Sequence, residues 1–201
     1  MLNVLLMDYD FYQRKGLSTL ISNEISDKGN DRVFFLSPSQ KESQDIADII
    51  FRNDMVTIHV KHKKQECETL ELIDKSEKIT IHVPFTLRNQ CLNDVFVKVK
   101  KILALASADY CSLTNIEEAC RKLGVKQYAQ LSDAENDVMI MIGRGYDNNE
   151  ISRVMNRSIK TISTHYRNAS RKIGVSNRAD FYRFASYVAS CRRDERNTIC
   201  L

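Results

Sequence analysis

The 201-residue chain contains no tryptophan, two prolines and six glycines. So little glycine and proline argues against a loop-rich β-sandwich, and a glycine-lined nucleotide site usually brings more glycine than this. No apolar run approaches the ~20 residues that span a bilayer. The first residues also lack the basic stretch, apolar core and cleavage site of a signal peptide. We therefore expect a soluble, cytoplasmic protein that makes no membrane contact.

Six cysteines are present, but they form no CxxC pair and no zinc-finger spacing with histidine. The sequence therefore predicts free thiols in a reducing compartment. A poorly spaced metal site is the alternative, and it would draw on His59, His62, Cys67, His82 or Cys91. The chain has no catalytic triad, phosphate-binding loop or dinucleotide fingerprint. We expect neither an enzyme nor a bound cofactor or metal.

The net charge of +4 is unevenly distributed along the chain. Residues 1–130 carry 18 basic and 18 acidic side chains, whereas residues 131–201 carry 12 basic and 8 acidic ones. Between positions 151 and 178 there are seven basic residues and no acidic one. A helix face that is merely solvated usually mixes both signs, so this block favours binding to a polyanion such as nucleic acid.

Short apolar runs rich in β-branched and aromatic residues predict strands in the first half of the chain. These runs are Leu2–Met7, Arg32–Leu36, Met55–Val60 and Lys78–Val83. Amphipathic helices are expected between and after them, at Tyr12–Ser22, Glu42–Phe51 and Leu92–Leu105. Alternating strands and helices predict an α/β domain over residues 1–106, with a parallel sheet covered by helices on both faces.

The rest of the chain reads as a linker, a helical domain and a tail. Residues 107–127 are the expected linker, with a short helix at Asn115–Leu123. Residues 128–190 form the helical domain, and residues 191–201 a basic C-terminal tail.

Four helices are expected in the helical domain. Ser132 and Glu135 predict a capping box at the start of the first one. The second is expected at Asn148–Met155, the third begins after Ser158 and stops at Gly174, and Asn177 caps the fourth. Two short helices joined by a tight turn, the second of them basic, indicate a helix-turn-helix.

The residues of this helical domain match a family pattern over positions 131–185. The matching segments are Leu131-Ser132-x-x-Glu135, Gly145, Glu150-Ile151-Ser152, Ser158-x-Lys160-Thr161-Ile162-x-x-His165, Lys172-Ile173-Gly174-Val175 and Asn177-Arg178. The domain resembles the C-terminal DNA-binding domain of the LuxR/FixJ/NarL family of bacterial transcription regulators. Its departures are mild, with Ser152 in place of the usual alanine and Met155 in place of a frequent leucine.

This resemblance implies that the third helix enters the major groove of DNA. Ser163, Thr164 and Arg167 would then face base edges, and Arg167 could bond guanine in bidentate fashion. The other implied DNA-binding residues contact phosphates and position the helix without specifying sequence. They are Lys160, Thr161, His165, Asn168, Arg171 and Lys172. An ordinary surface histidine remains the alternative for His165.

The resemblance also implies that the fourth helix supplies a dimer contact on DNA. Its aromatic residues are the candidates: Phe181, Tyr182, Phe184 and Tyr187. Double-stranded DNA is the expected partner. The chain would act as a homodimer or as a heterodimer with another response regulator, and RNA polymerase is a further candidate partner.

The N-terminal half resembles a response-regulator receiver more loosely, through Val4–Asp8 followed by Arg14–Leu17. A working receiver needs an acid pair, an aspartate acceptor and a lysine, because Mg²⁺ must neutralise the transferring phosphoryl group. Here Tyr9 follows Asp8, His59 falls at the acceptor position and Val83 near the lysine position. The half is interpreted as a degenerate, phosphorylation-independent receiver, an architecture that resembles some enterobacterial capsule and fimbria regulators.

Three other hypotheses stay open at this point. A conventional phospho-activated regulator would need an atypical acceptor such as Asp54 or Asp10. A small-ligand sensor of the quorum-sensing branch is disfavoured, because that sensor domain is longer and contains tryptophan. A module that regulates only through a protein partner is disfavoured by the intact basic helix.

Overall fold

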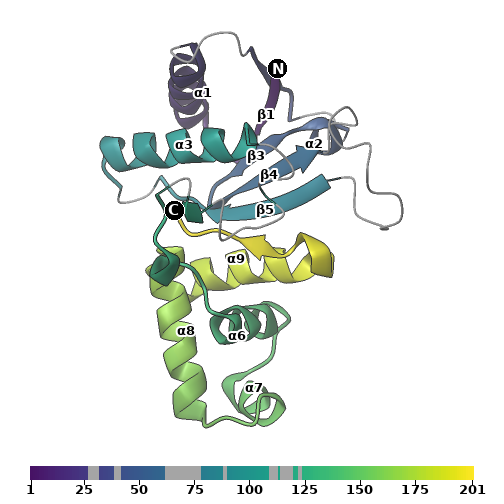
Figure 1. Cartoon of the computed structure of the whole chain (residues 1–201), viewed down its shortest axis with the longest axis vertical. Coiled ribbons are helices and arrows are strands. Elements are labelled where there is room, and N and C mark those ends of the chain that lie inside the picture. The colour runs from purple at the N-terminus through teal and green to yellow at the C-terminus, as the bar shows by residue number, and fades with distance from the viewer. Residues whose placement is uncertain are drawn as a thin grey trace.

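The computed structural model describes residues 1–26, 32–38, 42–61, 78–87, 90–108, 113, 120, 121 and 124–201. An α/β part and a helical part lie one above the other in Figure 1, which confirms the predicted fold class. Within the described residues, no helix combines the length and the apolar character that crossing a bilayer requires.

The N-terminal part is built on a six-stranded sheet with the order β2-β1-β3-β4-β5-β6. Its strands are β1 (Leu2–Leu6), β2 (Val33–Leu36), β3 (Ile49–Arg52), β4 (Met55–Lys61), β5 (Lys78–Pro84) and β6 (Asn197–Thr198). Strand β1 pairs in parallel with β2, as the predicted parallel sheet requires. It also pairs in parallel with β3, which the sequence did not predict as a strand. Strand β4 is antiparallel to both β3 and β5, so the sheet is mixed rather than wholly parallel.

The reason for the antiparallel strand lies between β3 and β4. Two residues, Asn53 and Asp54, separate the strands, and Arg52 pairs with Met55. Such a short connection closes a hairpin, whereas a parallel crossover needs a dozen residues or more. Because β5 is antiparallel to β4, it again runs in the same direction as β1 and β3.

The helix predicted over Glu42–Phe51 is wrong in its second half. Only α2 (Ser43–Ile46) is helical there, and the backbone becomes extended at Ala47. Asp48 exchanges hydrogen bonds with Asn3, its backbone N–H donating to the Asn3 carbonyl and its carboxylate accepting from the Asn3 N–H, each at 2.9 Å. This bonding starts the pairing of β3 with β1, and the spacing of Ile46, Ile49 and Ile50 only imitates a helical stripe.

Helices cover both faces of the sheet, as predicted, but they come from both parts of the chain. The helices α1 (Phe11–Ser26) and α3 (Leu92–Ala106) share one apolar core with the sheet, through residues such as Ile21 and Val99. On the other face, Ala47 packs with Leu5 and Ile50 of the strands. Met55 of β4 belongs to the core of the C-terminal helices, so that domain packs against the sheet as well.

The C-terminal helices are α6 (Asp133–Gly143), α7 (Asn148–Val154), α8 (Ile159–Ile173) and α9 (Arg178–Ser190). Each begins and ends within a residue or so of its predicted position. A 3-10 turn, η1 (Gln127–Ala129), precedes them, and the tail holds a second, η2 (Arg193–Glu195), followed by β6. The helix predicted at Asn115–Leu123 lies largely outside the described residues. The tail is therefore not a loose basic extension, because it returns to the N-terminal sheet and pairs with β5.

Candidate nucleic-acid interface

Helix α8 has defined signals at both ends. The Ser158 hydroxyl accepts a hydrogen bond from the Thr161 N–H at 3.1 Å, and the two hydroxyl oxygens lie 2.9 Å apart. At the other end Gly174 adopts a φ of 79°, the left-handed conformation that glycine takes without strain, and its N–H caps the helix. The predicted cap and stop are confirmed, and they fix where the basic face of α8 begins and ends.

The two sides of α8 differ in burial. Ile162, Ala169 and Ile173 are buried in the helical core. The opposite side carries an exposed stripe at a spacing of three or four residues, made of Lys160, Thr164, Arg167 and Arg171. Because residues spaced in this way share one face of a helix, the stripe can meet a single ligand surface along its whole length.

Arg167 lies in the middle of the exposed stripe. Its Nε donates to the Ser163 carbonyl at 3.3 Å, and its Nη2 donates to the Thr164 hydroxyl at 3.4 Å. The Thr164 hydroxyl donates in turn to the Lys160 carbonyl at 3.0 Å. These exposed, long hydrogen bonds hold the guanidinium along the helix surface with donor groups to spare. The three residues predicted to face base edges therefore lie together, with Ser163 half-buried at the side.

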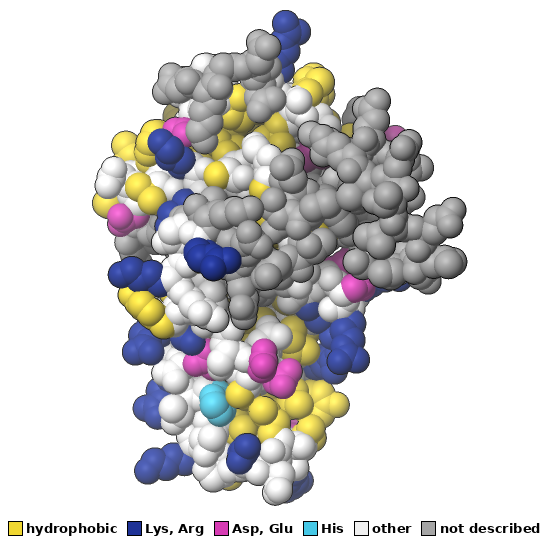
Figure 2. Space-filling model, in the orientation of Figure 1, with side chains coloured by type: hydrophobic (Ala, Val, Ile, Leu, Met, Phe, Trp, Pro, Cys, Tyr) yellow, Lys and Arg dark blue, Asp and Glu magenta, His cyan; other side chains and the backbone are white. Residues whose placement is uncertain are grey.

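The remaining predicted contacts lie around this stripe. Thr161, His165 and Asn168 are half-buried, at the flanks of the exposed residues. Arg153 and Arg157, on α7 and the turn before α8, are exposed as well, and α8 itself carries no acidic residue. In Figure 2, Lys and Arg side chains run down the edge of the molecule that α8 forms. A helix surface that carries only positive charge is complementary to a polyanion with regularly spaced negative charges, such as nucleic acid.

Lys172, which was predicted to contact a phosphate, has an ammonium group that already has two partners inside the domain. Its Nζ lies 2.6 Å from the Glu135 carboxylate and 2.8 Å from the Gln130 carbonyl. The same Glu135 oxygen accepts the Ser132 N–H at 2.9 Å, which completes the predicted capping box of α6. Burial opposes ionisation of this carboxyl, but the hydrogen bonds from Lys172 and Ser132 lower the pKa of Glu135 below its ordinary value. Lys172 thus joins α8 to the start of α6.

The aromatic residues proposed for a dimer contact lie in different surroundings. Phe181 and Phe184 are buried in the helical core, and the Phe181 ring packs edge-on against Tyr166 with 4.8 Å between centroids. Tyr187 packs edge-on against His82 of β5, with 5.6 Å between centroids. Tyr182 keeps 47% of its surface exposed. Of the four, only Tyr182 faces outward in this arrangement.

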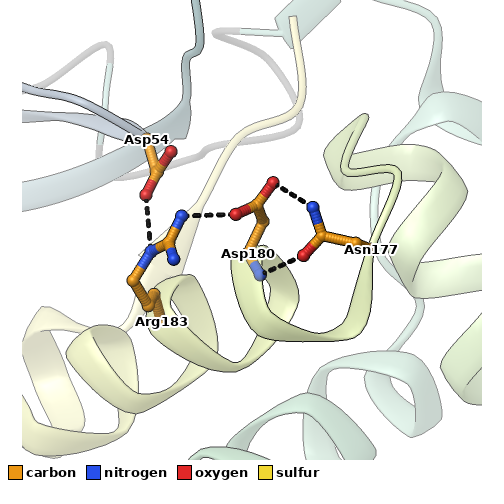
Figure 3. A network of polar contacts seen from close by, with 4 residues as sticks. All are labelled: Asp54, Asn177, Asp180 and Arg183. Carbon is orange, nitrogen blue, oxygen red and sulfur yellow. Dashed lines mark hydrogen bonds and ion pairs between the residues drawn. The ribbon is translucent and has the colours of Figure 1, made fainter. Parts of the chain in front are cut away.

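An ion-pair network that sequence reasoning missed joins α9 to the sheet (Figure 3). Arg183 Nε lies 2.9 Å from the Asp54 carboxylate, and the same guanidinium pairs with Asp180 one turn earlier. The Asn177 amide donates to Asp180 at 2.7 Å, while its carbonyl accepts the Asp180 N–H. The partners are 129 positions apart along the chain, so no local pattern could reveal them.

The sheet does not place His59 at the position that corresponds to the phosphoryl acceptor of a receiver. His59 sits inside β4, opposite Thr80, and its Nδ1 lies 3.2 Å from the Thr80 hydroxyl. The third strand of the β2-β1-β3 set is β3, which ends at Arg52 and is followed by Asn53 and Asp54. Val83 lies within β5 and is buried in the core. His82 is also buried, whereas His62 and Cys67 of the alternative metal set lie outside the described residues.

Comparison with known proteins identifies the helical part. Residues 129–185 match the profile of the family described as "Bacterial regulatory proteins, luxR family". This match confirms the predicted LuxR-type helix-turn-helix domain at the C-terminal end.

Curated relatives from Escherichia coli K12 align with about half of the chain. The "Transcriptional activator protein BglJ" is 27% identical over 112 residues, which cover 54% of this chain and 50% of BglJ. The "Transcriptional regulatory protein RcsB" is 29% identical over 98 residues, covering 48% and 45%. The "Uncharacterized HTH-type transcriptional regulator YuaB" is 32% identical over 54% of this chain and 27% of its own length. The matched segments thus span half or less of these relatives.

Solved structures of RcsB are similar to the chain over most of its length. One is described as "Structure of the two-component response regulator RcsB-DNA complex". It covers 95% of this chain and 99% of its own, with 18% sequence identity and a TM-score of 0.37. Another, "Structure of two RcsB dimers bound to two parallel DNAs", has 17% identity and a TM-score of 0.35.

Proposed function

We propose that this chain, whose residues 129–185 are a LuxR-family helix-turn-helix domain, is a sequence-specific DNA-binding transcription regulator. The observation that carries the proposal is the exposed stripe on α8, flanked by basic residues and free of acidic ones. In the proposed complex α8 lies in the major groove, where Ser163, Thr164 and Arg167 meet base edges. Helix α8 begins after the Ser158 cap, and in the proposed complex the backbone N–H groups of its first turn point at a phosphate.

The proposed role of Arg167 differs from that of Lys160. We expect Arg167→Ala to cost about 1–3 kcal/mol on the preferred site and to relax sequence preference, because a bidentate guanine contact is lost. Lys160→Ala should weaken binding to all sequences alike and reduce the salt slope by about one unit. Lys172 is unsuitable for this comparison, since its ammonium group is held by Glu135.

The measurement is selection of bound sequences from a random duplex pool with the full chain, followed by affinities at several salt concentrations. Full-length protein with no preference for any selected duplex contradicts sequence-specific binding. Equal losses of specific and non-specific affinity in both variants contradict the proposed orientation of α8.

The N-terminal part is proposed to act without phosphoryl transfer and to serve association with a second regulator chain. Tyr9 stands beside Asp8 where a second acid is needed, and its hydroxyl donates to the Arg52 carbonyl rather than facing a metal. Asp54, the aspartate at the end of β3, is occupied by Arg183. BglJ and RcsB are named as regulators, and one RcsB structure contains dimers on DNA, which supports an associating regulator.

Small phosphodonors with Mg²⁺ should neither label the chain nor change its affinity for DNA. The reason is chemical, since the acid pair and the lysine that stabilise a transferring phosphoryl group are replaced. Incubation with labelled acetyl phosphate, compared with an Asp54→Asn variant, checks this. Stable label that is lost in Asp54→Asn would instead support the phospho-activated alternative with Asp54 as acceptor.

The proposed role as a transcription regulator also includes a cytoplasmic location and contact with RNA polymerase.

A further inference from the structure

A pocket of about 340 Å³ lies between the N-terminal and C-terminal parts of the chain. The hairpin after β3, the end of β5 and α3 form one side of it, and the connection between α8 and α9 forms the other. Asp8 and Asp10 do not line it, so it is separate from the acid pair of a receiver. A volume at the lower end of the range for small-molecule sites suits a small metabolite rather than a large cofactor.

Lys98 of α3 brings a positive charge to the pocket. Its side chain is half-buried, and no carboxylate in the described part of the chain forms an ion pair with it. Burial lowers the pKa of Lys98, while Asp94 and Cys200 act in the opposite direction. When the Gln90 amide is oriented so that its nitrogen donates to the Thr86 carbonyl, its oxygen accepts from Lys98 Nζ at 3.0 Å. A partly desolvated ammonium group whose partner is a neutral amide is stabilised by a bound anion.

The other charged groups of the pocket are carboxylates. Asp54 and Asp180 both line it, and both pair with Arg183, which is not a lining residue. Figure 3 shows the guanidinium between the two carboxylates, with Asn177 bonded to Asp180. Two carboxylates that share one guanidinium keep a net negative charge. This part of the lining therefore favours a ligand group that is positively charged and donates hydrogen bonds.

Apolar residues complete the lining of the pocket. They are Pro84, Phe85, Ile173 and Val175. Phe85 belongs to the core of the N-terminal part and Ile173 to the core of the helical part, so each is held in place by its own domain. An apolar lining with a few fixed polar groups is typical of small-molecule sites. It favours a ligand whose charged groups are attached to a short apolar body.

We propose that this pocket binds a small zwitterion with an apolar side chain, of the class of the apolar α-amino acids. The carboxylate of the ligand pairs with the ammonium group of Lys98, and its amino group faces Asp54 and Asp180. The pocket thus gives the chain a small-molecule site in addition to the proposed DNA-binding surface. Because both parts of the chain line it, the bound ligand contacts both of them.

Equilibrium dialysis of the full chain against labelled leucine, with methionine and phenylalanine in parallel, tests the proposal without DNA. We expect saturable binding of at least one of these amino acids below millimolar concentration. Two analogues of leucine test the charges of the ligand, because isocaproate lacks the amino group and leucinol lacks the carboxylate. Each should compete with labelled leucine about tenfold more weakly than leucine itself, since each loses one charged partner.

A substitution in α3 tests the role of the ammonium group. Lys98→Met removes the charge and keeps an apolar stem of similar length. It should weaken leucine binding about tenfold and abolish the advantage of leucine over leucinol. Lys101→Met is the matched control, because Lys101 lies in the same helix, one turn further on, and does not line the pocket. Its affinity for leucine should equal that of the parent chain.

Each outcome supports or overturns the site. Absence of saturable binding of all three amino acids overturns it. Competition by leucinol or isocaproate as strong as that by leucine overturns it as well, and this result needs no variant. Equal binding by Lys98→Met and Lys101→Met places the ligand elsewhere and also overturns it. Amino-acid binding by a chain that selects no duplex sequence contradicts the proposed function alone, whereas sequence selection without amino-acid binding contradicts the pocket alone.

Discussion

Gly143→Ala is expected to destabilise the protein by about 3 kcal/mol or more, because it inserts a methyl group into a backbone contact. A Cβ at position 143 would lie 2.2 Å from the Ala185 carbonyl oxygen and 2.9 Å from the Ser186 nitrogen. Both atoms belong to the backbone of α9, which cannot move aside as a flexible side chain can. Helices α6 and α9 would have to separate, and with them the apolar core that supports α8.

The control for this prediction is Gly16→Ala. Gly16 lies inside α1, where a Cβ would meet nothing within 4 Å. Alanine favours a helix over glycine by about 1 kcal/mol, so this variant should be slightly more stable than the parent chain. Urea unfolding followed by circular dichroism measures both changes. Equal stability of Gly143→Ala and the parent would show that α6 and α9 can shift apart at little cost.

The contrast between these two glycines shows what the sequence could and could not reveal. Local signals were sufficient for the helical domain. The capping side chains of Ser132, Ser158 and Asn177 each bond to a backbone N–H within the first turn of the helix that they begin. The close approach of α6 to α9 leaves no local trace except a glycine inside a helical pattern. The exposed stripe of α8 was predictable because periodicity defines it, whereas the partner of Lys172 was not.

The N-terminal half was harder to predict for a related reason. Whether Ile49–Arg52 forms a strand or a helix depends on its pairing with another strand. Its partner β1 lies more than forty residues earlier. The return of β6 to β5 joins residues 116 positions apart, Ile81 and Asn197, and two residues of strand carry no recognisable pattern. Consequently the sheet order, the hairpin at Asp54 and the pairing of β6 with β5 emerge only from the three-dimensional structure.

Acid is expected to destabilise the fold well before the carboxylates titrate, because the sheet holds two neutral histidines, His82 buried and His59 half-buried. His82 is fully buried, with its Nδ1 3.4 Å from the Thr57 hydroxyl. Burial lowers the pKa of His82 to about 4, and Arg52 and His59 add to this effect while Glu195 opposes it. Burial, helped by Lys78, Lys61 and Arg52 and opposed by Asp48, also lowers the pKa of the less buried His59 to about 4.

The direction of this pH effect on the free energy of unfolding follows from proton binding in the folded and unfolded states. Between pH 6.5 and 4 the unfolded chain protonates its histidines while the folded chain keeps them neutral, so the free energy of unfolding falls as the pH falls. For His82 the expected loss between pH 6.5 and pH 5 is about 1.5 kcal/mol. His59 should add a smaller amount, because its partly exposed ring is better solvated.

His82→Gln isolates this contribution, since glutamine carries no charge at any of these pH values. The variant should be less stable than the parent at pH 7, because it loses ring packing against Tyr187, but its stability should fall less steeply toward pH 5. Gly16→Ala should shift the parent curve by a constant amount at every pH. Urea unfolding at half-unit pH intervals gives all three curves. If His82→Gln keeps the full parental slope, enclosure of this neutral histidine is not what makes the junction between sheet and α9 sensitive to acid.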